Sequence, residues 1–170
     1  MAGNRSSYVK LLDGKEPSIY LLRHALAPGI GDPQNFDVKD CSTQRNLSEE
    51  GQRQAVRIGK KFHDNGIKEP IVLSSQWCRC LETAELLGFK NIQDFSVLNS
   101  FFENFDLKDK QTVALESWLK KQKLDNHIVL VTHQVNITSL TGVSPVSGEM
   151  VVMRFDENNK LFTVGTLTTD

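Results

Sequence analysis

The sequence predicts an α/β domain built around a mainly parallel central sheet. Short apolar runs rich in β-branched residues alternate along the chain with segments whose apolar residues recur at helical spacing. Such alternation is typical of strand–helix–strand units, whose helices cover the faces of a parallel sheet. The chain has 170 residues, the ordinary length for one compact core. We therefore expect a three-layer α/β/α sandwich formed by residues 1–170 as a single domain.

The first half of the chain is expected to hold two strands and two long helices. A strand over 18–22 follows an N-terminal extension, residues 1–17, which contains a short helix around 8–12. After a polar stretch rich in turn signals, Ser48 caps a helix that ends near Asn65-Gly66. The other two elements of this half are a β-branched strand over 70–73 and a helix with an apolar stripe over 77–87.

The second half continues the alternation. A weaker strand around 95–98 precedes a helix over 109–121, where apolar residues recur at i,i+4. The run 127–132 is the clearest strand in the chain, because its apolar residues are continuous and mostly β-branched. After it come a short helix, 135–140, and two further strand candidates, 149–155 and 161–166.

Composition and charge narrow the class of protein. Lys and Arg number 20 against 21 Asp and Glu, for a net charge of −1. This balance argues against nucleic acid or an anionic membrane as the main partner. No apolar run reaches the roughly 18 residues of a membrane span. The cysteines, Cys41, Cys78 and Cys80, lack metal-ligand spacing. We expect no metal site, and one disulfide from Cys41 to either of the other two stays open.

Basic and imidazole side chains follow three predicted strands at the point where each strand ends. Arg23 and His24 follow the first strand, Arg79 lies at the start of the helix after the second, and His133 follows the run 127–132. Parallel sheets bind ligands at the carboxyl ends of their strands, so we expect these side chains at one edge. Arginine forks match phosphate oxygens and keep their charge. The sequence therefore predicts a site for a small phosphate dianion.

The reaction at such a site is narrowed by the motifs that the sequence lacks. The chain has no Walker-type nucleotide loop, no Cys followed five residues later by Arg, and no His/carboxylate cluster for two metals. A neutral imidazole is a competent nucleophile without a metal or a cofactor. Histidine-based phosphoryl transfer is thus the chemistry we expect, with arginines neutralising the transition-state charge.

Four motifs resemble those of the histidine phosphatase superfamily, which has the phosphoglycerate mutase-like fold. Residues 21–25 resemble its Arg-His-Gly signature, and 46–55 resemble its Leu-Ser/Thr-x-x-Gly-x-x-Gln-Ala helix opening. Residues 74–84 are similar to its Ser-x-x-x-Arg-x-x-x-Thr-Ala segment, and 131–133 to its late Thr/Ser-His motif. The motifs follow the family's order across 18–142, and their agreement is far more specific than Arg-His alone.

The resemblance implies a role for each matching residue. His24 would be the nucleophile that becomes phosphohistidine, and Arg23, Arg79 and His133 would complete the phosphate pocket. Glu103 is our candidate for the proton donor to the leaving group, and then for the base that activates water. Its position is the least specific of these assignments, because the acid varies in place within the family.

Two departures from the family pattern shape the expected function. Ala25 stands where the family usually has Gly, and the short chain leaves little room for lid insertions. We therefore expect a metal-independent phosphomonoester phosphatase acting on a small phosphorylated substrate. A mutase-type phosphotransferase and a catalytically silent phosphate-binding module are the alternatives. Gln44 and Arg45, in the long first loop, are candidates for contacting the rest of the substrate.

The segment 28–45 resembles a bacterial branch of the family, many of whose members are exported. In an oxidising compartment, a disulfide from Cys41 to a helix cysteine would be expected. The sequence leaves open which cysteine pairs with Cys41, and whether the protein is periplasmic, exported or cytoplasmic. It also leaves open the identity of the substrate and the oligomeric state.

Overall fold

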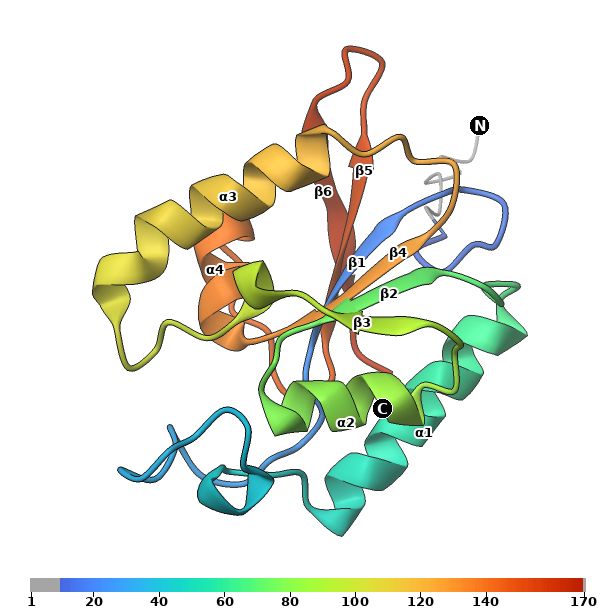
Figure 1. The fold of residues 1–170 in the computed structure, drawn as a ribbon. Helices are drawn as coiled ribbons and strands as arrows, with labels where there is room; N and C mark the ends of the chain where they lie inside the picture. Colours follow the sequence, from blue (N-terminus) through green and yellow to red (C-terminus); the bar gives the residue numbers. More distant parts are fainter. Residues whose placement is uncertain (1–9, 170) are drawn as a thin grey trace, which may run out of the picture.

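Six strands form one sheet in the computed structural model, which describes residues 10–169 (Figure 1). They are β1 Ile19–Arg23, β2 Ile71–Ser74, β3 Ile92–Asp94, β4 Ile128–Thr132, β5 Met150–Phe155 and β6 Leu161–Leu167. Their order across the sheet is β3-β2-β4-β1-β5-β6. β3, β2, β4 and β1 run parallel to one another, whereas β5 is antiparallel to both β1 and β6.

Helices cover both faces of this sheet, as Figure 1 shows. They are α1 Glu49–Asp64, α2 Cys78–Leu86, α3 Lys108–Lys120 and α4 Gln134–Thr141, with short 3-10 helices η1 Cys41–Thr43, η2 Ser96–Leu98 and η3 Phe105–Leu107. Within residues 10–169, none of the helices has the length and apolar content needed to cross a membrane.

Alternate residues of β1 point into two separate hydrophobic clusters, because side chains of a strand alternate between the faces of the sheet. Tyr20 and Leu22 pack with α1 and α2, whereas Ile19 and Leu21 pack with α3 and α4. Phe62 of α1 meets Tyr20 edge-on, with ring centroids 5.1 Å apart. The three-layer α/β/α arrangement with a mostly parallel sheet, predicted from the sequence, is thus confirmed.

The start of α1 follows from local chemistry. The Ser48 side chain accepts a hydrogen bond from the Gly51 backbone N–H at 3.1 Å, and Glu49 and Glu50 lie in the first turn. Both features stabilise a helix N-terminus, where N–H groups lack partners and the dipole is positive. The Ser48 backbone N–H also donates to Leu26 O, so the start of α1 is attached to the loop that follows β1.

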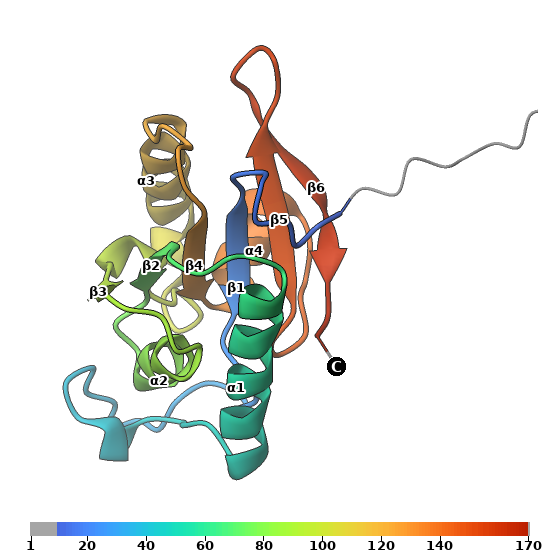
Figure 2. The same ribbon diagram turned by 90° about the vertical axis from the view of Figure 1, so that its right-hand side faces the viewer.

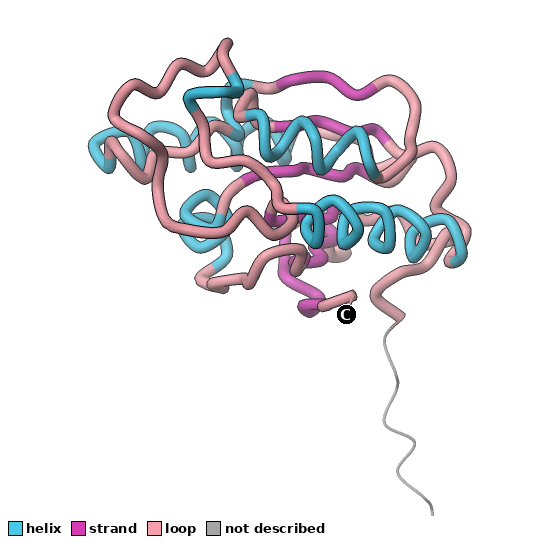
Figure 3. Tube along the Cα trace, turned by 90° about the horizontal axis from the view of Figure 1, so that it is seen from below, coloured by secondary structure: helices cyan, strands magenta, loops and turns pink. Residues whose placement is uncertain are grey.

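Long loops extend beyond one end of the strands, as the view from below shows (Figure 3). The longest joins β1 to α1, and Figure 2 shows it passing below α2 before it enters α1. We call this loop, residues 24–48, the first loop. It brings a polar segment to the carboxyl ends of β1, β2 and β4.

Two predicted elements differ from the structure. The segment 95–98 is not a strand: β3 lies earlier in the chain, and residues 96–98 form the 3-10 helix η2. Phe95 N still donates to Ser74 O, but Leu98 is fully buried against α3, which draws the chain away from the sheet edge. The short helix expected around 8–12 lies partly outside the described residues, and from 10 to 17 the chain forms bends and turns.

Candidate active site

The ends of β1, β2 and β4 lie side by side, which brings segments distant in the sequence to one place. Arg23 is paired with Thr132 in the parallel register, and His24 N donates to Thr132 O at 3.1 Å. Ser75 N donates to Val131 O at 2.9 Å. These bonds place the residues that follow the three strands around a pocket of about 110 Å³ that is open to solvent. It is lined by Arg23, His24, Gly29, Ile30, Gly31, Asp32, Arg45, Arg79, Ser100, Phe102, His133, Gln134 and Val135.

His24 is held in one orientation at the base of this pocket. Its Nδ1 atom lies 2.8 Å from Ala25 O, so Nδ1 carries the ring proton and Nε2 keeps its lone pair. Arg79 Nε donates to that Nε2 atom at 3.3 Å. Burial, reinforced by the charge of Arg79, lowers the pKa of His24 to about 3. The imidazole is therefore neutral at physiological pH.

Arg79 is a buried cation in the first turn of α2. Its NH1 atom donates to Asp32 Oδ1 at 2.8 Å, and the two side chains are only 4% and 6% exposed. The Nε atom faces His24, as described above. The guanidinium is therefore fixed between the nucleophile candidate and a carboxylate of the first loop.

His133, which follows β4, faces His24 with ring centroids 5.6 Å apart. Its Nε2 atom lies 2.8 Å from Ser75 Oγ and 3.5 Å from Cys80 Sγ. Burial, together with the proximity of His24 and Arg79, lowers the pKa of His133 well below its usual value. Burial raises the pKa of the Cys80 thiol to about 12. The pocket wall thus holds two neutral imidazoles, and behind His133 lies a buried thiol that stays protonated.

Arg23 is the last residue of β1 and lines the pocket. Its NH1 atom donates to Pro145 O at 2.9 Å. Among residues 10–169, its Nε atom is buried without a hydrogen-bond partner. A buried donor without a partner is costly, and an anion in the pocket would satisfy it.

The two candidates from the first loop differ in placement. Arg45 lines the pocket, and its Nε and NH1 atoms donate to the carbonyl oxygens of Gly31 and Ala27. Gln44 is buried inside the loop and does not line the pocket: its Nε2 donates to Asp37 O, and its Oε1 accepts from Cys78 N.

Glu103 is exposed and is not among the residues that line the pocket. Its carboxylate lies beside Gly31, where a Cβ atom would come within 2.9 Å of Glu103 Oε1. The structure therefore brings together Arg23, His24, Arg79 and His133, adds Arg45, and leaves Glu103 at the rim and Gln44 inside the loop.

Asp32 is a site residue that the sequence analysis missed. It lies within Gly31-Asp32-Pro33, where the neighbouring Gly and Pro indicate only a turn. The sequence signal that could have identified it is a carboxylate in a loop that starts directly after the Arg23-His24 pair. Its burial against Arg79 depends on a contact 47 residues apart in the chain.

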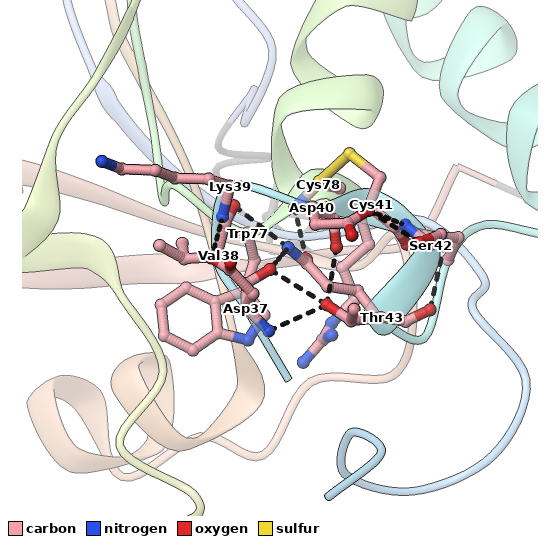
Figure 4. The surroundings of a disulfide bond; sticks show 12 residues. Asp37, Val38, Lys39, Asp40, Cys41, Ser42, Thr43, Trp77 and Cys78 are labelled. Carbon is pink, nitrogen blue, oxygen red and sulfur yellow. Dashed lines mark hydrogen bonds between the residues drawn. A yellow bond between two sulfur atoms is a disulfide. The ribbon is translucent and has the colours of Figure 1, made fainter. Parts of the chain in front are cut away.

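A disulfide joins the first loop to α2. Cys41 pairs with Cys78, the first residue of α2, with their Cα atoms 5.7 Å apart, and Cys80 is a buried free thiol (Figure 4). The pairing that the sequence left open is therefore Cys41 to Cys78. Since Arg79 is the next residue, the disulfide lies one residue from the cation that contacts His24.

The comparisons agree with this geometry. Residues 19–105, just over half of the chain, match the model of the histidine phosphatase superfamily (branch 1). A comparison with curated protein sequences gives no match.

Solved structures share the fold at low sequence identity. The open reading frame Rv3214 product of Mycobacterium tuberculosis is 16% identical, with a TM-score of 0.69 over 90% of this chain and 98% of that one. A phosphoserine phosphatase variant from Entamoeba histolytica, in complex with phosphoserine, is 17% identical, with a TM-score of 0.66 over 90% and 98%. The protein histidine phosphatase SixA, complexed with tungstate, is 14% identical, with a TM-score of 0.64 over 89% and 97%. These likenesses show that the fold is phosphoglycerate mutase-like.

Proposed function

Because the chain belongs to the histidine phosphatase superfamily, we propose that it is a phosphomonoester phosphatase that works without a metal, through a phosphohistidine at His24. The observation that carries the proposal is the state of His24. Its imidazole is neutral, its Nδ1 proton is held by Ala25 O, and its Nε2 lone pair faces a pocket lined by three arginines. A neutral imidazole in a cationic pocket suits attack on a phosphate dianion.

In the first step, His24 Nε2 attacks phosphorus in line with the ester oxygen. An N–P bond forms and the P–O bond breaks, with the leaving oxygen taking a proton. Arg23 and Arg79 donate to the equatorial oxygens, where negative charge accumulates, and His133 forms the adjoining wall. The Arg23 Nε atom gains the partner that it otherwise lacks.

In the second step, water attacks phosphohistidine from the side that the alcohol has left. The N–P bond breaks, the water loses a proton, and inorganic phosphate and neutral His24 are released. Glu103 is proposed as the group that gives the first proton and accepts the second. Its carboxylate lies beside Gly31, a residue of the pocket lining, and this proximity supports the assignment.

The leaving group is proposed to contact the rim of the same pocket. Ile30, Phe102 and Val135 supply apolar surface there, and Arg45 supplies a charge. We infer a small substrate, because the cavity of about 110 Å³ is smaller than sites that enclose a drug-sized ligand. Gln44 is assigned to holding the first loop rather than to substrate contact, since its side-chain hydrogen bonds are internal to the loop and the start of α2.

Hydrolysis of p-nitrophenyl phosphate in excess EDTA tests the proposal. We expect the wild-type protein to be active and His24→Ala to lose at least about 1,000-fold in kcat. His63→Ala, at an exposed position of α1, is the matched control and should retain activity. Full activity of His24→Ala would overturn the mechanism. Phosphate binding without turnover would favour the silent binding module, and transfer to a second hydroxyl of the substrate would favour a mutase.

A further inference from the structure

A carboxylate that the proposed mechanism does not use is buried in the wall of the pocket. Asp32 is 6% exposed and accepts three hydrogen bonds. Its Oδ1 atom accepts from Arg79 NH1 at 2.8 Å and from the Arg45 backbone N–H at 3.0 Å, and its Oδ2 atom accepts from Trp77 Nε1 at 3.2 Å. A negative charge beside a site for a dianion opposes ligand binding through space, so its presence needs a compensating role.

The geometry of Arg79 indicates that role. A guanidinium has five N–H donors in a rigid plane. In Arg79 the NH1 side is occupied by Asp32 and, at 3.4 Å, by Arg45 O, whereas the Nε side points at His24 Nε2. Among residues 10–169 no hydrogen bond is formed by the NH2 atom. The edge made by Nε and NH2 therefore faces the position where phosphorus would join His24.

We infer that Asp32 is a positioning residue, which holds the NH1 side of Arg79 so that its Nε–NH2 edge is presented to the phosphoryl group on His24. The inference rests on the proposed function, because it assigns Asp32 to the same phosphoryl-transfer site. Trp77 and the Arg45 backbone fix the carboxylate in turn, and Trp77 is itself stacked on Phe36 of the first loop, with ring centroids 4.9 Å apart.

The contacts of Asp32 favour this role over that of a proton donor. Burial alone would raise the pKa of Asp32, but its hydrogen bonds from Arg79 and the Arg45 backbone hold the pKa below the usual value. The carboxylate is therefore ionised and has no proton to give at neutral pH.

Ion pairing for stability alone is a weaker explanation. Replacing both members of a buried ion pair by apolar groups is often neutral or stabilising, whereas removing one member is costly. An ion pair kept only for stability does not explain why Arg79 presents its Nε atom to His24. The double variant Asp32→Ala/Arg79→Ala is therefore informative, because it removes both members of the pair and leaves neither charge buried alone.

A double-mutant cycle tests whether Asp32 acts through Arg79. We expect Asp32→Ala to lower kcat/KM for p-nitrophenyl phosphate by about 100-fold, as small misplacements of a positioned group do. In the Arg79→Ala background the same substitution should cost less than about threefold, since there is no guanidinium left to position. Asp32→Asn, which keeps an acceptor for Arg79, should recover part of the loss. Asp37→Asn is the matched control: it removes one negative charge at an exposed position of the same loop, and should leave kcat/KM unchanged.

Binding of two anions gives a readout that a purely structural role would not change. Vanadate resembles the five-coordinate transition state and inorganic phosphate resembles the product. We expect Asp32→Ala to weaken vanadate about tenfold more than phosphate, because the edge of Arg79 matters most in the transition state. If single alanine variants fail to fold, as judged by thermal melting, Asp32→Asn/Arg79→Gln and its two single variants complete the cycle with groups of similar shape.

Two results would overturn the inference. One is an equal loss of kcat/KM when Asp32 is changed in the wild-type protein and in Arg79→Ala, which would give Asp32 a separate role such as proton transfer. The other is a loss of kcat/KM below threefold for Asp32→Ala alone, in a protein that melts normally.

Failure of the proposed function is a distinct outcome. A wild-type protein that binds vanadate but hydrolyses nothing would refute phosphatase activity, while the cycle measured on vanadate affinity would still report the coupling of Asp32 with Arg79.

Discussion

The Nε atom of Arg79 donates a hydrogen bond to the Nε2 atom of His24 across 3.3 Å. The contact requires a lone pair on Nε2, and the bond between Nδ1 and Ala25 O requires the proton on the other nitrogen. Two contacts from different parts of the chain thus select the same tautomer. The nitrogen that keeps its lone pair, Nε2, is thus the nucleophile candidate, and a bound phosphate would take over the hydrogen bond from Arg79.

His24 should therefore remain neutral far into the acid range. With its pKa lowered to about 3 by burial and by Arg79, we expect its ring nitrogens to show no titration between pH 8 and pH 5. Nitrogen chemical shifts of a histidine-labelled sample, assigned with His24→Ala, measure this directly. A titration of His24 centred near the ordinary value of about 6.5 would contradict the prediction.

The same burial makes the folded protein sensitive to acid. An unfolded histidine takes up a proton near pH 6.5, whereas His24 and His133 resist it, so stability is complete above that pH and falls below it. Between pH 7 and pH 5, His24 alone should cost about 2 kcal/mol of unfolding free energy. Urea unfolding at both pH values measures the loss, and His24→Ala should show a smaller one. Equal stability at the two pH values would refute this linkage.

The disulfide should stabilise the fold and leave one thiol for titration. It closes a loop with a sequence separation of 37, which corresponds to about 4 kcal/mol in the chain-entropy account. Cys41→Ser/Cys78→Ser should lose stability of that order and raise KM, because the first loop is released from α2. Without reductant, no thiol should react in the native protein and one, Cys80, after denaturation. Three reactive thiols in denaturant would exclude the disulfide.

Two glycines of α1 offer a matched comparison between stability and activity. A Cβ atom at Gly51 would collide with Leu26 O in the first loop, and one at Gly59 with Leu87 O at the end of α2. Each Gly→Ala substitution should destabilise by about 1–3 kcal/mol, as overpacking does. Only Gly51→Ala should also alter kcat/KM measured well below the melting temperature, since Leu26 is two residues from His24. An equal change of kcat/KM in Gly59→Ala would contradict the prediction that only the contact with Leu26 affects activity.

Arg45 and Gln44 are adjacent, but their substitutions should differ in effect. Arg45 lines the pocket, so Arg45→Ala should raise KM on the order of tenfold, the equivalent of one charge-assisted contact. Gln44 bonds Asp37 O and Cys78 N inside the loop, so Gln44→Ala should lower the melting temperature more than it raises KM. Steady-state kinetics and melting curves of both variants measure these changes in KM and in melting temperature. An unchanged KM in Arg45→Ala would remove Arg45 from the substrate site.

The fold and the centre of the site could be predicted because both depend on short patterns. A strand followed at once by Arg23-His24 places those side chains at the carboxyl edge of any parallel sheet, and the same holds for His133. Helical periodicity located α1 and α2 for a similar reason. The local sequence is sufficient to place a site residue when that residue directly follows a parallel strand, because the strand direction puts it at the carboxyl edge of the sheet.

The parts that sequence reasoning missed depend on contacts between distant segments. Asp32 follows ordinary turn residues, and only the path of the first loop buries it against Arg79. Cys78 and Cys80 both lie in the first turn of α2, and the sequence does not reveal which one faces η1. Residues 96–98 have the apolar content of a strand, yet packing against α3 winds them into a 3-10 turn.

The position of β4 between β1 and β2 has a consequence for the growing chain. During synthesis, β1 and β2 are both complete well before β4 emerges, and neither can pair with the other in the final order. The two strands can therefore join one sheet only when β4, residues 128–132, is available to pair with both of them. Since His133 directly follows β4, the pairing that joins β1 to β2 also brings His133 beside His24.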